Sequence, residues 1–218
     1  FLLLMLTTLF ILILSIIGSA ETLEVDDDAV ESWYDETHVH TIQEAVDNAS
    51  VGDSIFVYNG TYVENVSINK QVNVSGESIE GVVVKGQFTV SNTSNLERMT
   101  ISNVTSGGDF PSAIFDTSIN SIFTNLKLVN NIYGIFLSEY SYGNIISNNL
   151  IGNNDFGIHV NNFGGVTAPT INDITIMDNN IENNYECGIH IENSNNNTIK
   201  HNRILNNVET GIYYLNAE

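Results

Sequence analysis

The sequence that decides the fold is IISNNLIGNNDFGIHV, residues 145–160, because the chain repeats it with variations. Three further copies read FTNLKLVNNIYGIFL (123–137), ITIMDNNIENNYECGIHI (174–191) and TIKHNRILNNVETGIYYL (198–215). Each contains two Asn positions, a short spacer and a Gly-Ile-x-apolar strand. Their glycines, Gly134, Gly157, Gly188 and Gly211, are 23, 31 and 23 residues apart, so the unit has about 23 residues with one eight-residue insertion. A period of this length indicates a solenoid, in which each unit packs against its neighbours.

The residue types within the unit distinguish between kinds of solenoid. A leucine-rich repeat needs a helical or 3₁₀ return segment, whereas runs such as Asn195–Asn197 favour turns. The apolar residues come in β-branched alternations that are typical of strands. We therefore predict an all-β, right-handed, single-stranded parallel β-helix of about 23 residues per coil. One interior column would be Ile135, Ile158, Ile189 and Ile212.

The repeated asparagines predict stacked corners. Stacked Asn side chains bond one another and the turn backbone, so these residues are expected structurally and need no ligand. Leu126 occupies the second column in the first copy. The two columns are Asn131, Asn154, Asn184 and Asn207, and Asn149, Asn179 and Asn202.

Residues 1–20, FLLLMLTTLFILILSIIGSA, are almost entirely apolar and end in small residues. They read as a secretory signal cut after Ala20, truncated at its start, and a retained membrane anchor is the alternative. Both interpretations predict a secreted, periplasmic or cell-surface protein. The single cysteine, Cys187, excludes internal disulfides and is predicted to lie in the core.

The charge is strongly negative, with 26 acidic and 6 basic residues and a net charge of −20. Nucleic acid and anionic membrane surfaces are therefore excluded as partners. Residues 21–39 are rich in acids and are predicted to form a solvated linker ahead of a β-helix domain at 40–218. Asp26, Asp27 and Asp28 could bind Ca²⁺, although an exposed acidic run is the favoured interpretation.

The segment TIQEAVDNA, residues 41–49, predicts a short amphipathic helix with Thr41 as its N-cap and Glu44 at the capping-box position. Such a helix would cover the N-terminal end of the solenoid. The sequence that follows predicts the three strands of the first coil around Ile55–Val57, Val66–Ile68 and Val72–Val74.

Two features mark the later coils. The insertion NNFGGVTAP, Asn161–Pro169, forms either a binding loop or a neutral one. The chain reaches Glu218 without a C-terminal cap, so we expect the domain to be C-terminally incomplete, with further coils beyond it.

The stretch TIQEAVDNASVGDSIFVYNGTYVENVSINKQVNVSGE, residues 41–77, followed by iterated NNxIxxNxxGI, resembles the NosD-like family of CASH-type β-helices in the pectin-lyase-like superfamily. The resemblance covers about residues 40–218, and its most specific part runs from Gly52-Asp53 through Gly60, Tyr62 and Glu64. It implies an exported solenoid of archaeal or bacterial envelopes that handles polysaccharide or, in its namesake, assists copper delivery to a periplasmic reductase. Fold alone does not transfer activity.

Catalytic motifs are weak in this sequence, and no catalytic residue is assigned. Glycoside hydrolysis needs paired carboxylates about 5 to 9.5 Å apart, and the polygalacturonase and epimerase signatures of this superfamily are absent. A polysaccharide lyase, hydrolase or epimerase with its site in further coils remains an alternative. The available acids fall in different phases of the repeat: Asp155, Asp173, Asp178, Glu182 and Glu192.

The variable x of Gly-Ile-x-apolar points outward from its strand. In successive coils it is Phe136, His159, His190 and Tyr213, a column of flat rings that could bind carbohydrate; cross-strand ring packing is the alternative. His159 and His190 lie one coil apart, near enough to share Cu or Zn. His38 and His40 form a second pair on one extended segment.

We therefore expect an exported cell-envelope β-helix, a non-catalytic carbohydrate-binding or structural module whose partners are envelope or extracellular glycans. The two alternatives are the polysaccharide-active enzyme and a NosD-like periplasmic copper-binding accessory protein.

Overall fold

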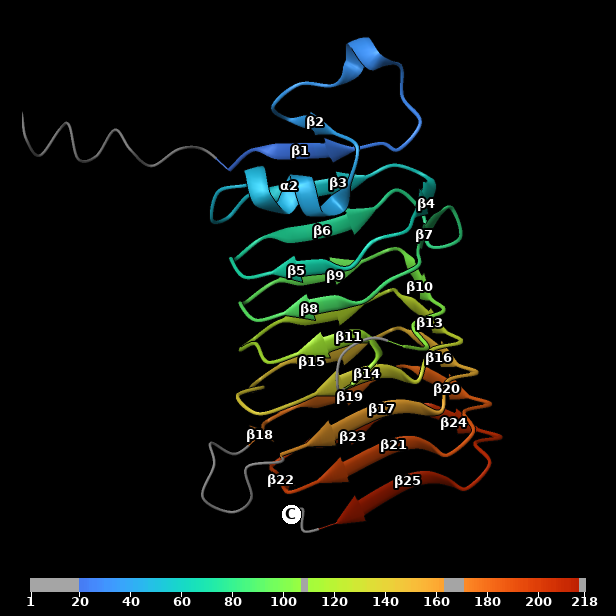
Figure 1. Cartoon of the computed structure of the whole chain (residues 1–218). Helices are drawn as coiled ribbons and strands as arrows, with labels where there is room; N and C mark the ends of the chain where they lie inside the picture. Colours follow the sequence, from blue (N-terminus) through green and yellow to red (C-terminus); the bar gives the residue numbers. More distant parts are fainter. Residues whose placement is uncertain (1–19, 107–109, 163–170, 216–218) are drawn as a thin grey trace, which may run out of the picture.

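Three parallel sheets run the length of the molecule, and the chain visits each in turn once per coil (Figure 1). This computed structural model describes residues 20–106, 110–162 and 171–215. The predicted right-handed parallel β-helix is confirmed. The hydrophobic stretch 1–19 lies outside the described residues, as do most of the insertion (163–170) and residues 216–218.

Sheet A has nine strands, and sheets B and C have seven each. Sheet A is β2 (His38–Val39), β1 (Thr22–Val25), β3 (Ser54–Val57), β6 (Asn73–Gly76), β9 (Asn95–Glu97), β12 (Ile122–Thr124), β15 (Ile145–Ser147), β19 (Thr175–Met177) and β23 (Thr198–Lys200). Sheet B is β4 (Gly60–Tyr62), β7 (Val82–Val84), β10 (Thr100–Ser102), β13 (Lys127–Val129), β16 (Leu150–Gly152), β20 (Asn180–Glu182) and β24 (Arg203–Leu205).

Sheet C carries the Gly-Ile-x-apolar strands of the repeat. It is β5 (Val66–Ile68), β8 (Phe88–Val90), β11 (Ser112–Asp116), β14 (Tyr133–Leu137), β17 (Phe156–Asn161), β21 (Cys187–Glu192) and β25 (Thr210–Leu215). A small fourth sheet pairs β18 (Ile171–Asn172) with β22 (Ser194–Asn195). The other elements are the 3₁₀ helix η1 (Glu31–Trp33) and the α-helix α2 (Ile42–Asn48). Among the described residues, no helix is long and apolar enough to cross a membrane.

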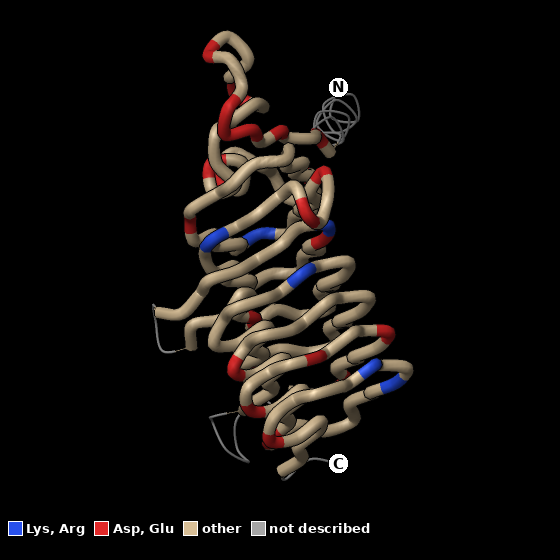
Figure 2. Tube along the Cα trace, turned by 90° about the vertical axis from the view of Figure 1, so that its right-hand side faces the viewer, with Lys and Arg blue, Asp and Glu red and all other residues tan. Residues whose placement is uncertain are grey.

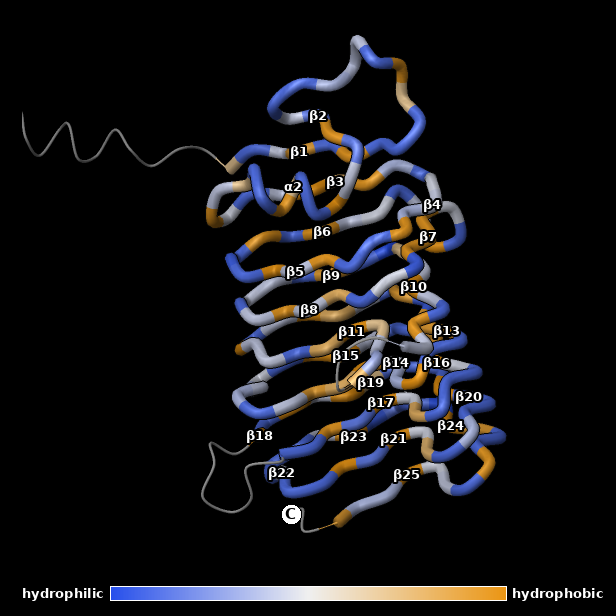
Figure 3. The backbone as a smooth tube through the Cα atoms, in the orientation of Figure 1, coloured by the Kyte–Doolittle hydropathy of each residue, from blue (hydrophilic) through white to orange (hydrophobic). Residues whose placement is uncertain are grey.

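The interior follows from alternation along each strand. Hydrophobic and hydrophilic residues alternate along the coils in Figure 3, and the inward members form one continuous core. The predicted isoleucine column is in register, from Ile135 through Ile158 and Ile189 to Ile212. The first three are fully buried, whereas Ile212 on the last coil is 41% exposed. Cys187 is buried and reduced.

The two predicted asparagine columns form hydrogen-bonded ladders at the turns between the sheets. After the first member of each column, every ladder oxygen accepts both the backbone N–H and the side-chain N–H of the Asn one coil earlier. Asn154 Oδ1, for example, lies 3.0 Å from both nitrogens of Asn131. Asn154 Nδ2 donates to Leu128 O at 3.0 Å and to Asn184 Oδ1 at 3.1 Å. The ladders therefore provide hydrogen bonds to buried backbone groups at the turns, which lie outside the hydrogen bonding of the sheets.

The residue before each ladder Asn has a positive φ, and the residue types there suit that conformation. Asn130, Asn153, Asn183 and Asn206 have φ between 55° and 61°. Asn enters this left-handed region more readily than most residues. This explains the Asn-Asn pairs of the first column; in the second column Asn148, Asp178 and His201 take the same conformation.

The glycine of each repeat is required by close packing between coils. A Cβ added at Gly157 would lie 2.4 Å from the carbonyl oxygen of Gly188, and one at Gly134 would lie 2.5 Å from that of Gly157. No real Cβ tolerates such a distance to backbone, so only glycine lets these turns stack.

The N-terminal cap explains the specific motif at residues 52–64. The predicted helix is confirmed as α2, and Thr41 Oγ1 accepts the N–H of Glu44 at 3.2 Å. The Glu64 carboxylate accepts the first two helix N–H groups, those of Ile42 and Gln43, at 2.9 Å each. Tyr62 Oη donates to Tyr58 O at 2.9 Å. The polar residues of this motif therefore hold the cap in place.

Two expectations about the N-terminal part differ from the structure. Residues 21–39, expected as a solvated linker, contribute β1 and β2 to sheet A, because their alternating apolar residues Leu23, Val25 and Val39 are buried. The first coil consists of β3, β4 and β5, whereas the expected third strand at Val72–Val74 overlaps β6 and begins the second coil.

Candidate functional site

The register of sheet C brings the four predicted ring residues together. Phe136 pairs with His159, His159 with His190, and His190 with Tyr213, all on the outer side of their strands. Each occupies the variable position between two interior residues of a Gly-Ile-x-apolar strand. The fold therefore holds these side chains in one column, one coil apart.

The rings of this column stack on one another. The Phe136 and His159 centroids are 5.0 Å apart with planes at 29°, and those of His159 and His190 are 4.4 Å apart at 8°. Tyr213 lies 4.8 Å from His190 but is tilted by 57°. The two imidazoles are therefore the most closely parallel pair.

Exposure rises steeply along the column. Phe136 is fully buried, His159 is 7% exposed and Tyr213 is 42% exposed. Phe110 stacks on Phe136 at 4.5 Å, which contributes to this burial. Phe136 therefore cannot contact a ligand in this structure, and the accessible part of the column is its lower half, at His190 and Tyr213.

Other rings that the sequence analysis did not single out extend the cluster. Phe115 stacks near Phe136 at 5.8 Å, and Tyr133 lies 5.2 Å from Phe156. Phe156 lies 5.1 Å from His159. Tyr133 and Phe156 could have been found from the alignment of the repeats, because each directly precedes the repeat glycine.

Three imidazole nitrogens are buried without a hydrogen-bond partner among the described residues. They are Nδ1 of His159 and both ring nitrogens of His190. Burial, followed by the neighbouring His190, lowers the pKa of His159 to about 3, and burial lowers the pKa of His190 against the opposing effect of Glu192. Both rings are therefore neutral at pH 7, the form that binds metal ions.

A polar pair lies beside the two imidazoles. Asn161 Nδ2 lies 3.4 Å from His159 Nε2 and 3.2 Å from Glu192 Oε2. Glu192 Oε2 in turn lies 3.8 Å from His190 Nε2. Asn161 and Glu192 follow the column residues by two positions and point to the same side of their strands, so the alignment could have revealed them.

These residues provide the ligand types for a copper ion but not a preformed site. Neutral imidazole suits copper, and a carboxylate can complete the ligand set. The two ring planes are almost parallel, at 8°, so the nitrogen lone pairs of the two imidazoles do not converge on one point. One ring must therefore rotate before both can bind the same ion. His190 is the ring with room, because its side chain is 17% exposed beside the tilted Tyr213.

The other predicted ligand groups have different environments. His38 Nδ1 lies 2.8 Å from Asp35 Oδ1, and His40 stacks on Tyr34 at 3.4 Å. These two imidazoles therefore pack separately within the N-terminal segment. Asp26, Asp27 and Asp28 bring carboxylate oxygens within 4.8 Å of one another, on the acidic N-terminal end visible in Figure 2.

The carboxylates that the sequence places in different phases also have separate structural partners. Glu182 pairs with Arg203 at 2.6 Å, and Asp178 lies 3.6 Å from His201. A further acid, Asp116, is fully buried and accepts hydrogen bonds from Ser118, Ser141 and Asn144. Burial raises the pKa of Asp116 to about 7, although hydrogen bonds from Ser118 and Ser141 oppose this shift.

Comparison with known families identifies the class of protein to which this chain belongs. The family model described as periplasmic copper-binding protein (NosD) matches residues 46–218, most of the chain. The chain therefore belongs to the NosD family, and the resemblance seen in the sequence is confirmed. No curated protein matches the chain in sequence.

Solved structures share the fold at low identity. Pectin methylesterase PemA from Erwinia chrysanthemi superposes with a TM-score of 0.59 at 14% identity, over 83% of this chain and 67% of the esterase. ORF18 of Geobacillus virus E2 gives 0.53 at 14% identity, over 81% of this chain and 44% of the viral protein. The chain thus spans less than half the length of the viral protein. These similarities show the β-helix and nothing about activity.

Proposed function

We propose that this chain is an exported, envelope-side β-helix that binds copper on the outer face of sheet C. His159 and His190 are the imidazole ligands, and Glu192 is the carboxylate nearest to them. The single observation that carries the proposal is the pair of stacked imidazoles, in which three buried nitrogens have no hydrogen-bond partner within the described part of the chain. A buried polar group without a partner is rare and calls for an explanation.

Membership of a family named for copper binding supports this choice of metal. Copper would supply a Lewis-acidic, redox-active centre. The protein's own part is to keep both rings neutral by burial and to hold them one coil apart. The tilted, half-exposed Tyr213 leaves the lower side of the site accessible to a partner that delivers or receives the ion.

Isothermal titration of the chain with Cu²⁺ at pH 7 tests the proposal. The wild-type chain is expected to bind one ion, and His159→Ala and His190→Ala are each expected to weaken binding at least tenfold. His201→Ala is the matched control, because His201 is a 75% exposed imidazole on another face. The triple change of Asp26, Asp27 and Asp28 to Asn controls for ions held by the acidic end. Equal heats in all variants would reject the copper site.

Carbohydrate binding is the second candidate, and the exposure of Tyr213 favours it. A 42% exposed ring at the accessible end of the column can pack on the apolar face of a sugar. Binding to an array of envelope glycans is expected to fall in Tyr213→Ala and to persist in His159→Phe. If Tyr213→Ala binds every glycan as the wild type does, this second candidate is wrong.

A further inference from the structure

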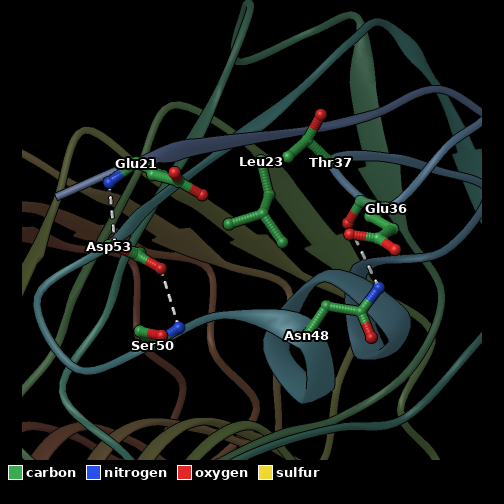
Figure 4. A pocket seen from close by; sticks show the side chains of 7 residues that line it. All are labelled: Glu21, Leu23, Glu36, Thr37, Asn48, Ser50 and Asp53. Carbon is green, nitrogen blue, oxygen red and sulfur yellow. Dashed lines mark hydrogen bonds between the residues drawn. The ribbon is translucent and has the colours of Figure 1, made fainter. Parts of the chain in front are cut away.

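The N-terminal end of the solenoid contains an acidic pocket, and none of the described residues that line it is basic (Figure 4). Its volume is about 330 Å³, and it lies where β1, α2 and the turn before β3 meet. Three of its seven lining residues are acids, so it favours a cation. The lining residues are Glu21, Leu23, Glu36, Thr37, Asn48, Ser50 and Asp53.

Asp53 connects this pocket to the start of the first strand. Asp53 is 5% exposed, and its carboxylate accepts the backbone N–H of Ser50 at 2.7 Å and that of Glu21 at 2.8 Å. Glu21 directly precedes β1, whose first residue, Thr22, pairs with Ser54. The backbone nitrogen of Glu21 is therefore fixed against a buried carboxylate.

Ala20 and Glu21 are both exposed and lie outside regular secondary structure. Gly18, Ser19 and Ala20 are the small residues that precede a signal cleavage site. A cut further along the chain would remove residues that β1 needs for pairing with β3. A cut further back would leave the new amino group away from Asp53.

We propose that the mature chain begins at Glu21 and that its α-ammonium group forms an ion pair with Asp53, which locks the N-terminal cap. Water adds across the Ala20–Glu21 peptide bond in a reaction catalysed by an endopeptidase of the export machinery. The C–N bond breaks, Ala20 keeps the new carboxylate, and the nitrogen of Glu21 becomes an ammonium. One neutral N–H donor is thereby replaced by a charged group with three donors, which gives a stronger, charge-assisted bond to the carboxylate.

The pairing has a defined pH dependence. An α-amino group has an ordinary pKa of about 8, and a neighbouring carboxylate raises it. The ammonium form is therefore fully present below about pH 8, and the ion pair is lost as the pH rises through the raised value. The other charged groups that line the pocket, the side chains of Glu21 and Glu36, are also acidic and act in the same direction.

The first experiment determines the mature terminus. The full chain, expressed with an initiating methionine in an exporting host, is recovered from outside the cytoplasm and its intact mass is measured. A mass that begins at Glu21 is expected. A mass that begins elsewhere, or that retains the leader, would overturn the proposal.

The second experiment tests the lock itself. The exported chain is acetylated selectively at its α-amino group, and its melting temperature is compared with that of the free amine at pH 7 and pH 10. Acetylation is expected to lower the melting temperature by about 3 °C at pH 7 and to have little effect at pH 10. In Asp53→Asn the pH 7 effect should vanish, whereas in Asp47→Asn, an exposed acid of α2, it should persist.

Acetylation that changes the melting temperature equally at both pH values, or equally with and without Asp53, would contradict the ion pair. The wild-type comparison alone decides the question if Asp53→Asn fails to fold. Neither experiment depends on copper, so the proposed function and this inference fail separately.

Discussion

The corner turns and the outer ring column occupy the same coils and the same register, yet they differ in how their polar atoms are satisfied. At the corners each Asn bonds its copy one coil away, as Asn154 does with Asn131 and Asn184. In the column the residues are Phe136, His159, His190 and Tyr213, and nitrogens of the two histidines have no hydrogen-bond partner among the described residues. The difference teaches that a row whose polar atoms bond one another from coil to coil marks structure, whereas a row with polar atoms that lack such partners marks a candidate site.

Removal of one ladder residue is expected to have the largest effect. Asn154→Ala deletes four buried hydrogen bonds, made to Asn131, Leu128 and Asn184, and should cost about 4 kcal/mol in the free energy of unfolding measured in urea. Asn207→Ala, in the last and partly exposed coil, is the matched control and should cost clearly less. Equal losses would mean that the ladder does not depend on burial.

The next largest effect is expected from the repeat glycines. Gly157→Ala forces a Cβ against the Gly188 carbonyl and should cost about 3 kcal/mol. In Gly211→Ala the nearest atom, on the side chain of Ile204, is 3.4 Å away, so the cost should stay below about 0.5 kcal/mol. Thermal unfolding of the pair measures the difference. A tolerated Gly157→Ala would show that the coils can separate.

The burial of His159 in the column should make the free energy of unfolding of the metal-free protein depend on pH. The pKa of His159 is about 3 in the folded chain against 6.5 for the free side chain, so stability is fully present above pH 6.5 and falls as the pH drops toward 3. The expected slope is about 1.4 kcal/mol per pH unit. Urea unfolding with chelator at pH 7 and pH 5 measures it. His159→Phe should remove this contribution, and an unchanged slope would contradict the burial of a neutral ring.

Much of the fold could be predicted from the sequence, because the repeat period of a solenoid determines which residues of successive coils are paired. The spacing of Gly134, Gly157 and Gly188 aligns the strands, and the alignment then fixes the asparagine ladders and the ring column. The N-terminal segment has no internal copy to align. Its many acidic residues indicate a solvated segment, although Leu23 and Val25 alternate with them and are buried. That is why it was expected to be a linker.

The site was predictable in position but not in exposure. The alignment places Phe136 on the outer face, yet it cannot show that Phe110, more than twenty residues earlier, stacks on it. The alignment also cannot show which imidazole nitrogens lack a hydrogen-bond partner, because that depends on the position of every neighbouring side chain. Side chains from irregular segments therefore decide which part of the column is available.

The central claim is that His159 serves copper binding and not the fold, and His159→Phe tests it most directly. Phe preserves the stacking with Phe136 and removes a buried polar group, so the melting temperature should stay within about 3 °C of the wild type or rise. Copper titration of the same variant at pH 7 should show at least a tenfold loss of affinity. Wild-type copper affinity in a folded His159→Phe chain would contradict the account.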